Sequence, residues 1–147
     1  MKFQNGCWLL KEGFASFSPQ QIYDCKITGE EVVICAPTAV VNGRGNTIDG
    51  INLTLRITAP LPEVIRVQTW HHRGAVKRGP EFELTPVTAD QKSPLEVEET
   101  EAAITVRSGH LSLVIGRQPF DMRYQRDGKL LTRSVPRDLA FIKENWK

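Results

Sequence analysis

Cysteine is scarce in this sequence, and its spacing does not suit a metal site. The three cysteines, Cys7, Cys25 and Cys35, are odd in number, lack a C-x-x-C spacing and have no histidine at a ligand-like offset. A zinc site is therefore not expected. If Thr28 and Glu31 flank a two-residue turn, Cys25 and Cys35 project to opposite faces of a hairpin and cannot easily form a disulfide. We expect buried free thiols.

Long apolar runs and an excess of charge of one sign are also missing. No run approaches the ~18 apolar residues of a membrane span, and the opening MKFQNGCWLL lacks the apolar core of a signal peptide, which predicts a cytoplasmic protein if Met1 is the natural start. Nineteen basic and seventeen acidic residues leave a net charge of +2, and they are scattered, so nucleic-acid binding has little support. The glycines of residues 41–50 lack the spacing of a phosphate loop.

What the chain does contain is alternation of apolar and polar residues, most clearly over residues 102–132. A two-residue turn at Ser108-Gly109 would place every apolar residue of one hairpin on the same face. The expected opposing pairs are Val106 with Leu111, Ile104 with Leu113, and Ala102 with Ile115. A third strand follows, in which Phe120, Met122 and Tyr124 alternate with polar residues. Its return through Asp127-Gly128, a type I′ turn, would set Leu131 opposite Tyr124.

The same alternation recurs along the rest of the sequence. Short strands are predicted near residues 6–17, 23–28, 31–36, 53–58, 64–71 and 81–84. About nine short strands separated by turn signals predict an all-β fold, an antiparallel β-sandwich with little helix. The length of 147 residues suits one domain, residues 1–147. Only residues 137–146 could be helical, because Leu139, Ile142 and Trp146 fit an i, i+3, i+7 stripe.

The stretch AITVRSGHLSLVIGRQPFDMRYQRDGKLLT resembles the N-terminal β-domain of glycoside hydrolase family 31, which contains α-glucosidases and α-xylosidases. The shared pattern is an apolar hairpin, a strand that starts at Pro119-Phe120, and an Asp127-Gly128-Lys129 turn. The segments FQNGCWLLKEG, EEVVICAPT and VIRVQTWHHRGAVKRGPEFEL are similar to the bacterial α-xylosidase branch of the family. The resemblance covers nearly the whole chain.

This resemblance implies a galactose-mutarotase-like β-sandwich that belongs to a larger enzyme. In the family, the β-domain is followed by a (β/α)₈ barrel with two catalytic aspartates, and such a barrel alone needs roughly 200 residues. The chain is therefore expected to be a truncated, non-catalytic piece of a retaining hydrolase of terminal α-linked xylose or glucose. No catalytic, cofactor or metal residue can be carried over. The expected partner is the parent's own barrel, whose substrate entrance this piece would shape, and homo-oligomer contacts are a further expectation.

Several residues could carry chemistry, and each has a simpler interpretation. Glu81 and Glu83 would share a strand face about 7 Å apart. Retaining glycosidases need about 5 to 5.5 Å between carboxyls, which favours a solvated strand face.

His71 and His72 follow Trp70 at a strand end, where they could meet the rim of the barrel. Because neighbours in a strand point to opposite faces, one histidine is expected to be packed and the other exposed.

Aromatic rings and basic side chains offer further candidates. Trp8, Trp70 and Trp146 could stack on sugars, but burial against the core or the missing domain is favoured. Tail residues such as Phe141 would cover the core or form a sticky patch after truncation. A basic loop could meet an acidic partner, although a solvated loop is favoured; its residues are Arg73, Lys77 and Arg78. Three serines have no His and Asp arrangement around them in sequence: Ser108, Ser112 and Ser134.

Two other functions remain open. A standalone carbohydrate-binding module would bind sugar without a barrel. A mutarotase-type sugar epimerase would need a general base and a general acid at the ring, for which His71 or His72 with Glu81 or Glu83 could be imagined. The fold alone cannot choose among these functions.

Overall fold

The computed structural model describes residues 9–48, 50–71, 95–135 and 138–144, which form short strands wherever apolar and polar residues alternate. The elements in this part of the chain are β1 (Phe14–Phe17), β2 (Asp24–Ile27), β3 (Glu31–Pro37), the 3₁₀ helix η1 (Arg44–Thr47), β4 (Asn52–Thr58), β5 (Arg66–Trp70), β6 (Glu96–Glu99), β7 (Ala103–Ser108), β8 (Leu111–Arg117), β9 (Phe120–Arg126), β10 (Lys129–Ser134) and β11 (Phe141–Glu144).

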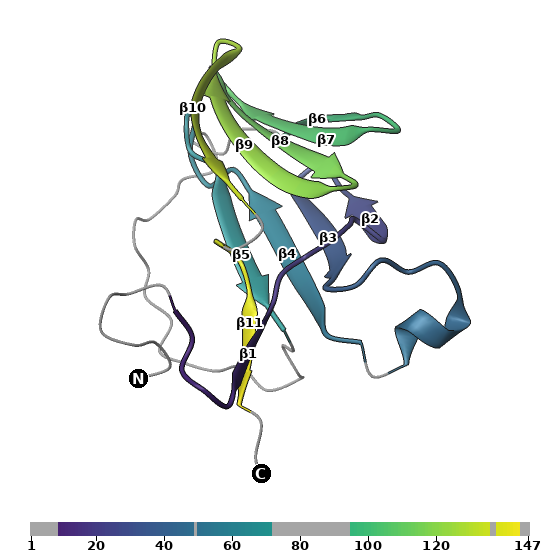
Figure 1. Ribbon diagram of the computed structural model, residues 1–147. Helices are drawn as coiled ribbons and strands as arrows, with labels where there is room; N and C mark the ends of the chain where they lie inside the picture. The colour runs from purple at the N-terminus through teal and green to yellow at the C-terminus, as the bar shows by residue number, and fades with distance from the viewer. Residues whose placement is uncertain (1–8, 49, 72–94, 136–137, 145–147) are drawn as a thin grey trace.

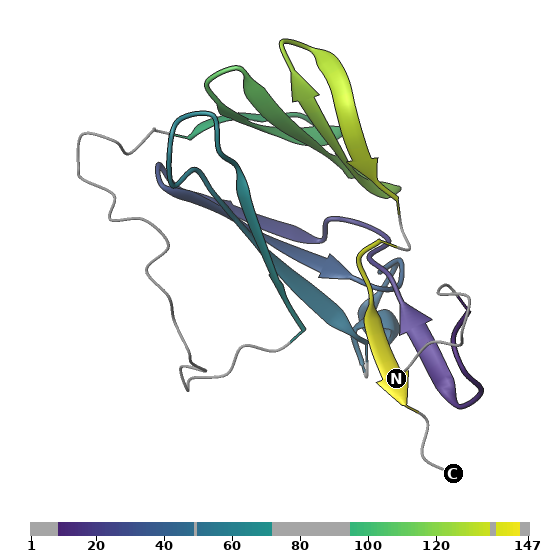
Figure 2. The same ribbon diagram turned by 90° about the vertical axis from the view of Figure 1, so that its left-hand side faces the viewer.

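The strands form two principal antiparallel sheets and a small one. One sheet has the order β10-β9-β8-β7-β6, the second has the order β2-β3-β4-β5, and β1 pairs only with β11. The two larger sheets face each other, and the β1–β11 ribbon lies beside one end of the four-stranded sheet (Figures 1 and 2). The predicted all-β sandwich is confirmed.

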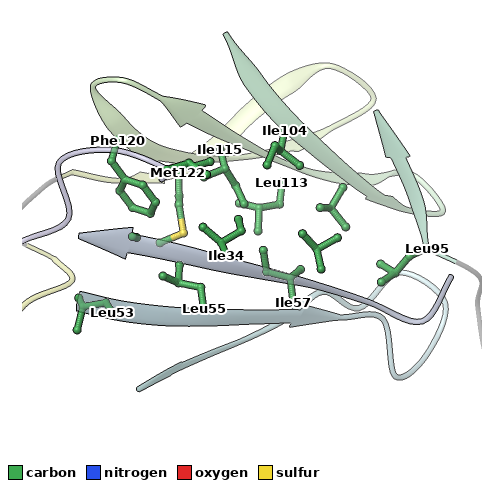
Figure 3. Packing of buried hydrophobic residues seen from close by; sticks show 14 of the residues in the cluster. Ile34, Leu53, Leu55, Ile57, Leu95, Ile104, Leu113, Ile115, Phe120 and Met122 are labelled. Atoms are coloured by element: carbon green, nitrogen blue, oxygen red, sulfur yellow. The ribbon is translucent and has the colours of Figure 1, made fainter. Parts of the chain in front are cut away.

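The core lies between these two sheets. Alternate residues of β3 and β4 point at alternate residues of β7, β8 and β9, as the twofold periodicity of strands requires (Figure 3). The largest fully buried side chains of the core are Val32, Ile34, Leu55, Ile57, Ile104, Val106, Leu113 and Ile115. Each buried aliphatic side chain of this size contributes about 1.5–3 kcal/mol, so the shared core holds the two layers together.

Backbone hydrogen bonds also tie the sheets together at one end. The segment before β2 runs between the layers: Gln20 N donates to Pro37 O of the four-stranded sheet at 2.9 Å, and Gln20 O accepts from Phe120 N of the five-stranded sheet at 3.0 Å. Ile22 N donates to Arg117 O at 2.8 Å. This segment thus supplies backbone partners to both sheets at once.

A second tie lies at the opposite end, where the loop after β4 meets the β7–β8 turn. Ser108 Oγ donates to Leu61 O at 3.3 Å, and His110 N donates to Glu63 Oε1 at 2.7 Å. The expected register of this hairpin is wrong. Ser108 pairs with Leu111, so the turn residues are Gly109 and His110. The observed pairs nearer the centre are Val106 with Leu113 and Ile104 with Ile115.

The physical reason for the register lies in the turn. Gly109 has φ +58°, which suits the first central position of a type II′ turn. Ser108 is buried and belongs to β7, so it is the last strand residue before the turn. Because the pairing is displaced by two residues, the predicted apolar face is still correct. The Asp127-Gly128 turn is confirmed, with φ of 49° and 77°. Leu131 was expected opposite Tyr124, but a bulge between Leu130 and Thr132 puts Thr132 there instead.

The helix considered for residues 137–146 is not found in the described part of that segment, residues 138–144. Residues Phe141–Glu144 form the strand β11, in which Phe141 pairs with Phe17 and Glu144 pairs with Phe14. A distant strand supplies the backbone hydrogen bonds of this segment, and that pairing outweighs a weak helical periodicity. The two ends of the described chain are therefore joined in one ribbon.

Candidate functional site

His71 follows β5, and the structure holds its imidazole in place without giving it a catalytic partner. Nδ1 of His71 lies 3.2 Å from Asn52 O, and the ring centroid lies 4.2 Å from that of Phe141 at an interplanar angle of 44°. His71 is nevertheless exposed. Trp70 beside it is half-buried and lies opposite Thr54 in the β4–β5 pair. These contacts indicate a structural anchor between β4, β5 and β11.

Many of the predicted candidates cannot be placed. Those that lie outside the described residues are Cys7, Trp8, His72, Arg73, Lys77, Arg78, Glu81, Glu83 and Trp146. The glutamate pair, the basic loop and the epimerase pairing of histidine with glutamate thus stay predictions.

The serine candidates have structural surroundings. Ser108 is buried, and its hydroxyl donates to a backbone carbonyl, that of Leu61. Ser112 is also buried, whereas Ser134 is half-buried at the end of β10. A hydroxyl that donates to a main-chain carbonyl is bound as a structural group, so Ser108 serves to fix the loop after β4.

The two described cysteines are free and half-buried, which corrects the expectation that they would be buried. Cys25 lies opposite Ile34 and Cys35 opposite Asp24, as predicted for a pair on opposite faces. Burial, followed by the charge of Glu99, raises the pKa of Cys25 to about 11, so its thiol is protonated at neutral pH and a poor nucleophile. Cys35 Sγ lies 3.0 Å from Asn52 Nδ2.

A shallow, open depression near the β6–β7 turn was not predicted. Its volume is about 730 Å³, and Glu99, Thr100, Glu101 and Arg117 line it. The guanidinium of Arg117 donates through Nε to Thr100 O at 2.9 Å and forms an ion pair with Glu99. Arg117 thus fastens the β6–β7 turn to β8.

A second unpredicted cluster joins two hairpin turns. His110 Nδ1 lies 2.7 Å from Asp127 Oδ1, while Glu63 Oε1 accepts from the His110 amide; Glu63 Oε2 is buried and has no hydrogen-bond partner among the described residues. The hydrogen bond to Asp127 and the charges of Asp127 and Glu63 raise the pKa of His110, against a lowering by desolvation and by Arg126.

This His–Asp pair resembles the base and its orienting carboxylate in hydrolases only superficially. Both side chains are 65% exposed, and the contacts of His110 run to turns instead of to a nucleophile. The sequence held a usable signal, because pairing β8 with β9 sets Leu111 opposite Arg126 and so brings His110 beside Asp127. Neither a cluster of three metal-ligating side chains nor a helix able to cross a bilayer occurs in the described ranges.

Comparison with known proteins places these features in a family. Residues 54–147 match the model of the glycosyl hydrolase 31 N-terminal galactose mutarotase-like domain. The chain belongs to this family.

Curated relatives of this glycosyl hydrolase 31 domain are much longer than the chain. It is 31% identical to the α-xylosidase XylQ of Lactiplantibacillus pentosus over 143 residues, which are 97% of this chain and 18% of that protein. It is 26% identical to an α-xylosidase of Emericella nidulans over 84% of this chain and 15% of that protein. The chain thus spans less than a fifth of these relatives.

Solved structures agree with the fold. An uncharacterized Listeria monocytogenes protein, crystallised with α- and β-D-glucose, magnesium and calcium, is 18% identical with a TM-score of 0.61. The cycloalternan-forming enzyme of the same organism, in complex with a pentasaccharide substrate, is 16% identical with a TM-score of 0.58. Each comparison covers 88% of this chain and 11% of the solved chain.

Proposed function

We propose that this chain is the non-catalytic N-terminal β-sandwich of a retaining α-glycosidase of the α-xylosidase type. The parent enzyme hydrolyses terminal α-linked xylose or glucose in the cytoplasm. The observation that supports this proposal is the 31% identity to an α-xylosidase along 97% of this chain but only 18% of that relative. The chain then corresponds to one domain of a multidomain enzyme.

The chemistry of retaining hydrolysis indicates which domain of the parent enzyme carries the catalytic acids. That reaction needs a carboxylate nucleophile and a carboxylic acid about 5 to 5.5 Å apart, on either side of the glycosidic bond. Among the described residues, the clusters around His71, His110 and Arg117 each connect strands or turns. The catalytic acids are therefore assigned to the parent's barrel, and this domain packs on the barrel and shapes its substrate entrance.

The test compares two polypeptides: the 147-residue chain, and the natural polypeptide whose reading frame contains it. Both are assayed with aryl α-xylosides and aryl α-glucosides, and the anomer released first is identified by NMR. The longer polypeptide is expected to hydrolyse one substrate class with retention, and the 147-residue chain neither. Hydrolysis by the 147-residue chain alone, or a reading frame that stops at Lys147, would refute the proposal. Sugar binding by a chain that ends there would favour a carbohydrate-binding module.

A further inference from the structure

The two edges of the five-stranded sheet differ sharply in chemistry. At one edge, β6 has the sequence EVEE, and Glu98 forms an ion pair with Arg107 at 2.9 Å. Charged side chains along an edge strand discourage pairing with another strand. At the other edge, β10 has the sequence KLLTRS, and its leucines are exposed. The β6 edge is thus acidic along most of its length, whereas the β10 edge combines two basic residues, Lys129 and Arg133, with adjacent exposed leucines.

The exposed apolar residues of β10 and the turn after it form what we call the β10 patch. Its members are Leu130, Leu131 and Val135, with exposed fractions of 52%, 56% and 39%. Side chains of this kind gain about 25 cal/mol for each Å² of apolar surface removed from water, so three such exposed side chains within six residues favour a partner. The β10 patch therefore differs from the solvated surface expected of an outer strand.

The five-stranded sheet also extends beyond the layer that covers it. On β9, Phe120 and Met122 are each 4% exposed and belong to the core, whereas every residue of β10 before Ser134 is exposed. β10 lies at the rim of its sheet, and among the described strands β9 is its only partner (Figure 1). Within the described part of the chain, one side of its backbone has no strand partner and could accept another strand, and its leucines are more than half exposed.

We propose that a β-strand from the rest of the parent glycosidase pairs with β10 and covers the β10 patch. The proposal rests on the proposed function. The relatives are more than five times as long as this chain, since it spans 18% and 15% of them, so a covering segment is available within the same polypeptide. Tethering makes such pairing intramolecular and favours it over a second copy at ordinary concentrations.

The chemistry of β10 defines the partner strand. Strand addition supplies backbone hydrogen bonds, and alternate side chains supply specificity. The partner should present apolar side chains to Leu130 and Leu131. It should also carry an acidic side chain, because both charged residues of β10, Lys129 and Arg133, are basic and exposed. Cross-strand pairs of opposite charge then fix the register.

Hydrogen exchange measures the pairing directly. Amide exchange of β10 is followed by mass spectrometry in the 147-residue chain and in the natural longer polypeptide. We expect the β10 amides to exchange at least tenfold more slowly in the longer polypeptide, with β3 as an internal reference that changes little. Equal β10 exchange in both polypeptides would overturn the proposal.

Matched substitutions separate the β10 patch from a general effect of surface charge. In the longer polypeptide, Leu130→Lys with Leu131→Lys is expected to restore fast exchange of β10. The control Ile48→Lys changes an equally apolar residue that is 72% exposed near η1, and it should leave β10 protected. The same result for both variants would contradict the proposal. In the 147-residue chain, neither variant should lower the unfolding midpoint, which shows that the domain still folds.

The remaining outcomes distinguish this proposal from the proposed function. Hydrolysis of α-xylosides with an unprotected β10 would refute strand pairing alone. A protected β10 in a longer polypeptide without glycosidase activity would refute the proposed enzyme and leave the strand contact supported. If light scattering shows that the 147-residue chain dimerises and its β10 becomes protected on dimerisation, the occupant is a second copy. That result, or a reading frame ending at Lys147, would overturn the proposal.

Discussion

At the scale of single residues, the two glycines of the hairpin turns make a matched pair. Gly109 and Gly128 both have positive φ, but a Cβ on Gly109 would lie 2.0 Å from Glu63 Oε1, whereas a Cβ on Gly128 would point into open space. The Glu63 carboxylate is a flexible end and would move away, which would break its hydrogen bond to His110. Glycine is thus favoured at Gly109 both by the positive φ and by the contact with Glu63. At Gly128 it is favoured by the positive φ alone.

We therefore predict that Gly109→Ala destabilises the chain more than Gly128→Ala. Positive φ costs an alanine about 1–2 kcal/mol in either turn. Loss of a hydrogen bond to a charged group adds about 1.5–3 kcal/mol at Gly109. Urea unfolding of both variants measures the difference, and equal losses would show that Glu63 does not tie the loop to the hairpin.

His110 should make stability depend on pH. Its pKa is raised in the folded chain above the ordinary 6.5, first by the hydrogen bond to Asp127. A folded pKa above the unfolded one means that the stabilisation is fully present below pH 6.5 and is lost as the pH rises through the raised pKa. We expect His110→Gln to flatten the change in urea midpoint between pH 6 and pH 8 at low salt, and Asp127→Asn to do the same. A slope that persists in both variants would contradict this assignment.

At the scale of elements, the alternation of apolar and polar residues predicted the strands well but predicted the register of their pairing less well. The pairing of β2 with β3 is as predicted, because Gly29 and Glu30 form a turn between Thr28 and Glu31. The predicted register of the β7–β8 hairpin was displaced by two residues. The sequence does not show that the Ser108 hydroxyl donates a hydrogen bond to Leu61 O, 47 residues away. The bulge at Leu131 is equally invisible, since it inserts one residue without altering the strand composition.

The C-terminal segment that contains β11 shows most clearly that local patterns do not reveal distant strand pairing. The packing of this segment can be tested. Phe141 of β11 packs against the core and against the His71 ring. We predict that Phe141→Ala lowers the free energy of unfolding by about 1.5–3 kcal/mol, the contribution of a large apolar side chain. Tyr23→Ala is the control, because Tyr23 is 56% exposed and should change stability by less than about 0.5 kcal/mol. Equal, small effects would favour a tail that is not docked.

At the scale of the whole molecule, the place of Glu63 could not be predicted from local patterns. The β8–β9 pairing brings His110 beside Asp127, but Glu63 comes from the loop after β4 and meets them only because the two sheets pack face to face. The family resemblance supplied what the patterns could not, namely that this sandwich is a glycosyl hydrolase 31 N-terminal domain. The free β10 edge appears only in the structure, since KLLTRS reads like any exposed strand.

The two sheets share one core and are tied at both ends, so we predict that they unfold together. Leu55 of the four-stranded sheet and Leu113 of the five-stranded sheet are both fully buried. Leu55→Ala and Leu113→Ala should each cost about 2–5 kcal/mol, and Ile48→Ala, at a residue 72% exposed, should cost less than about 0.5 kcal/mol. In urea, NMR signals from β3 and β8 should disappear at one midpoint in every variant. If Leu113→Ala instead melts β8 while β3 stays folded, each sheet is stable without the other, and the ties through Gln20 and Glu63 contribute little.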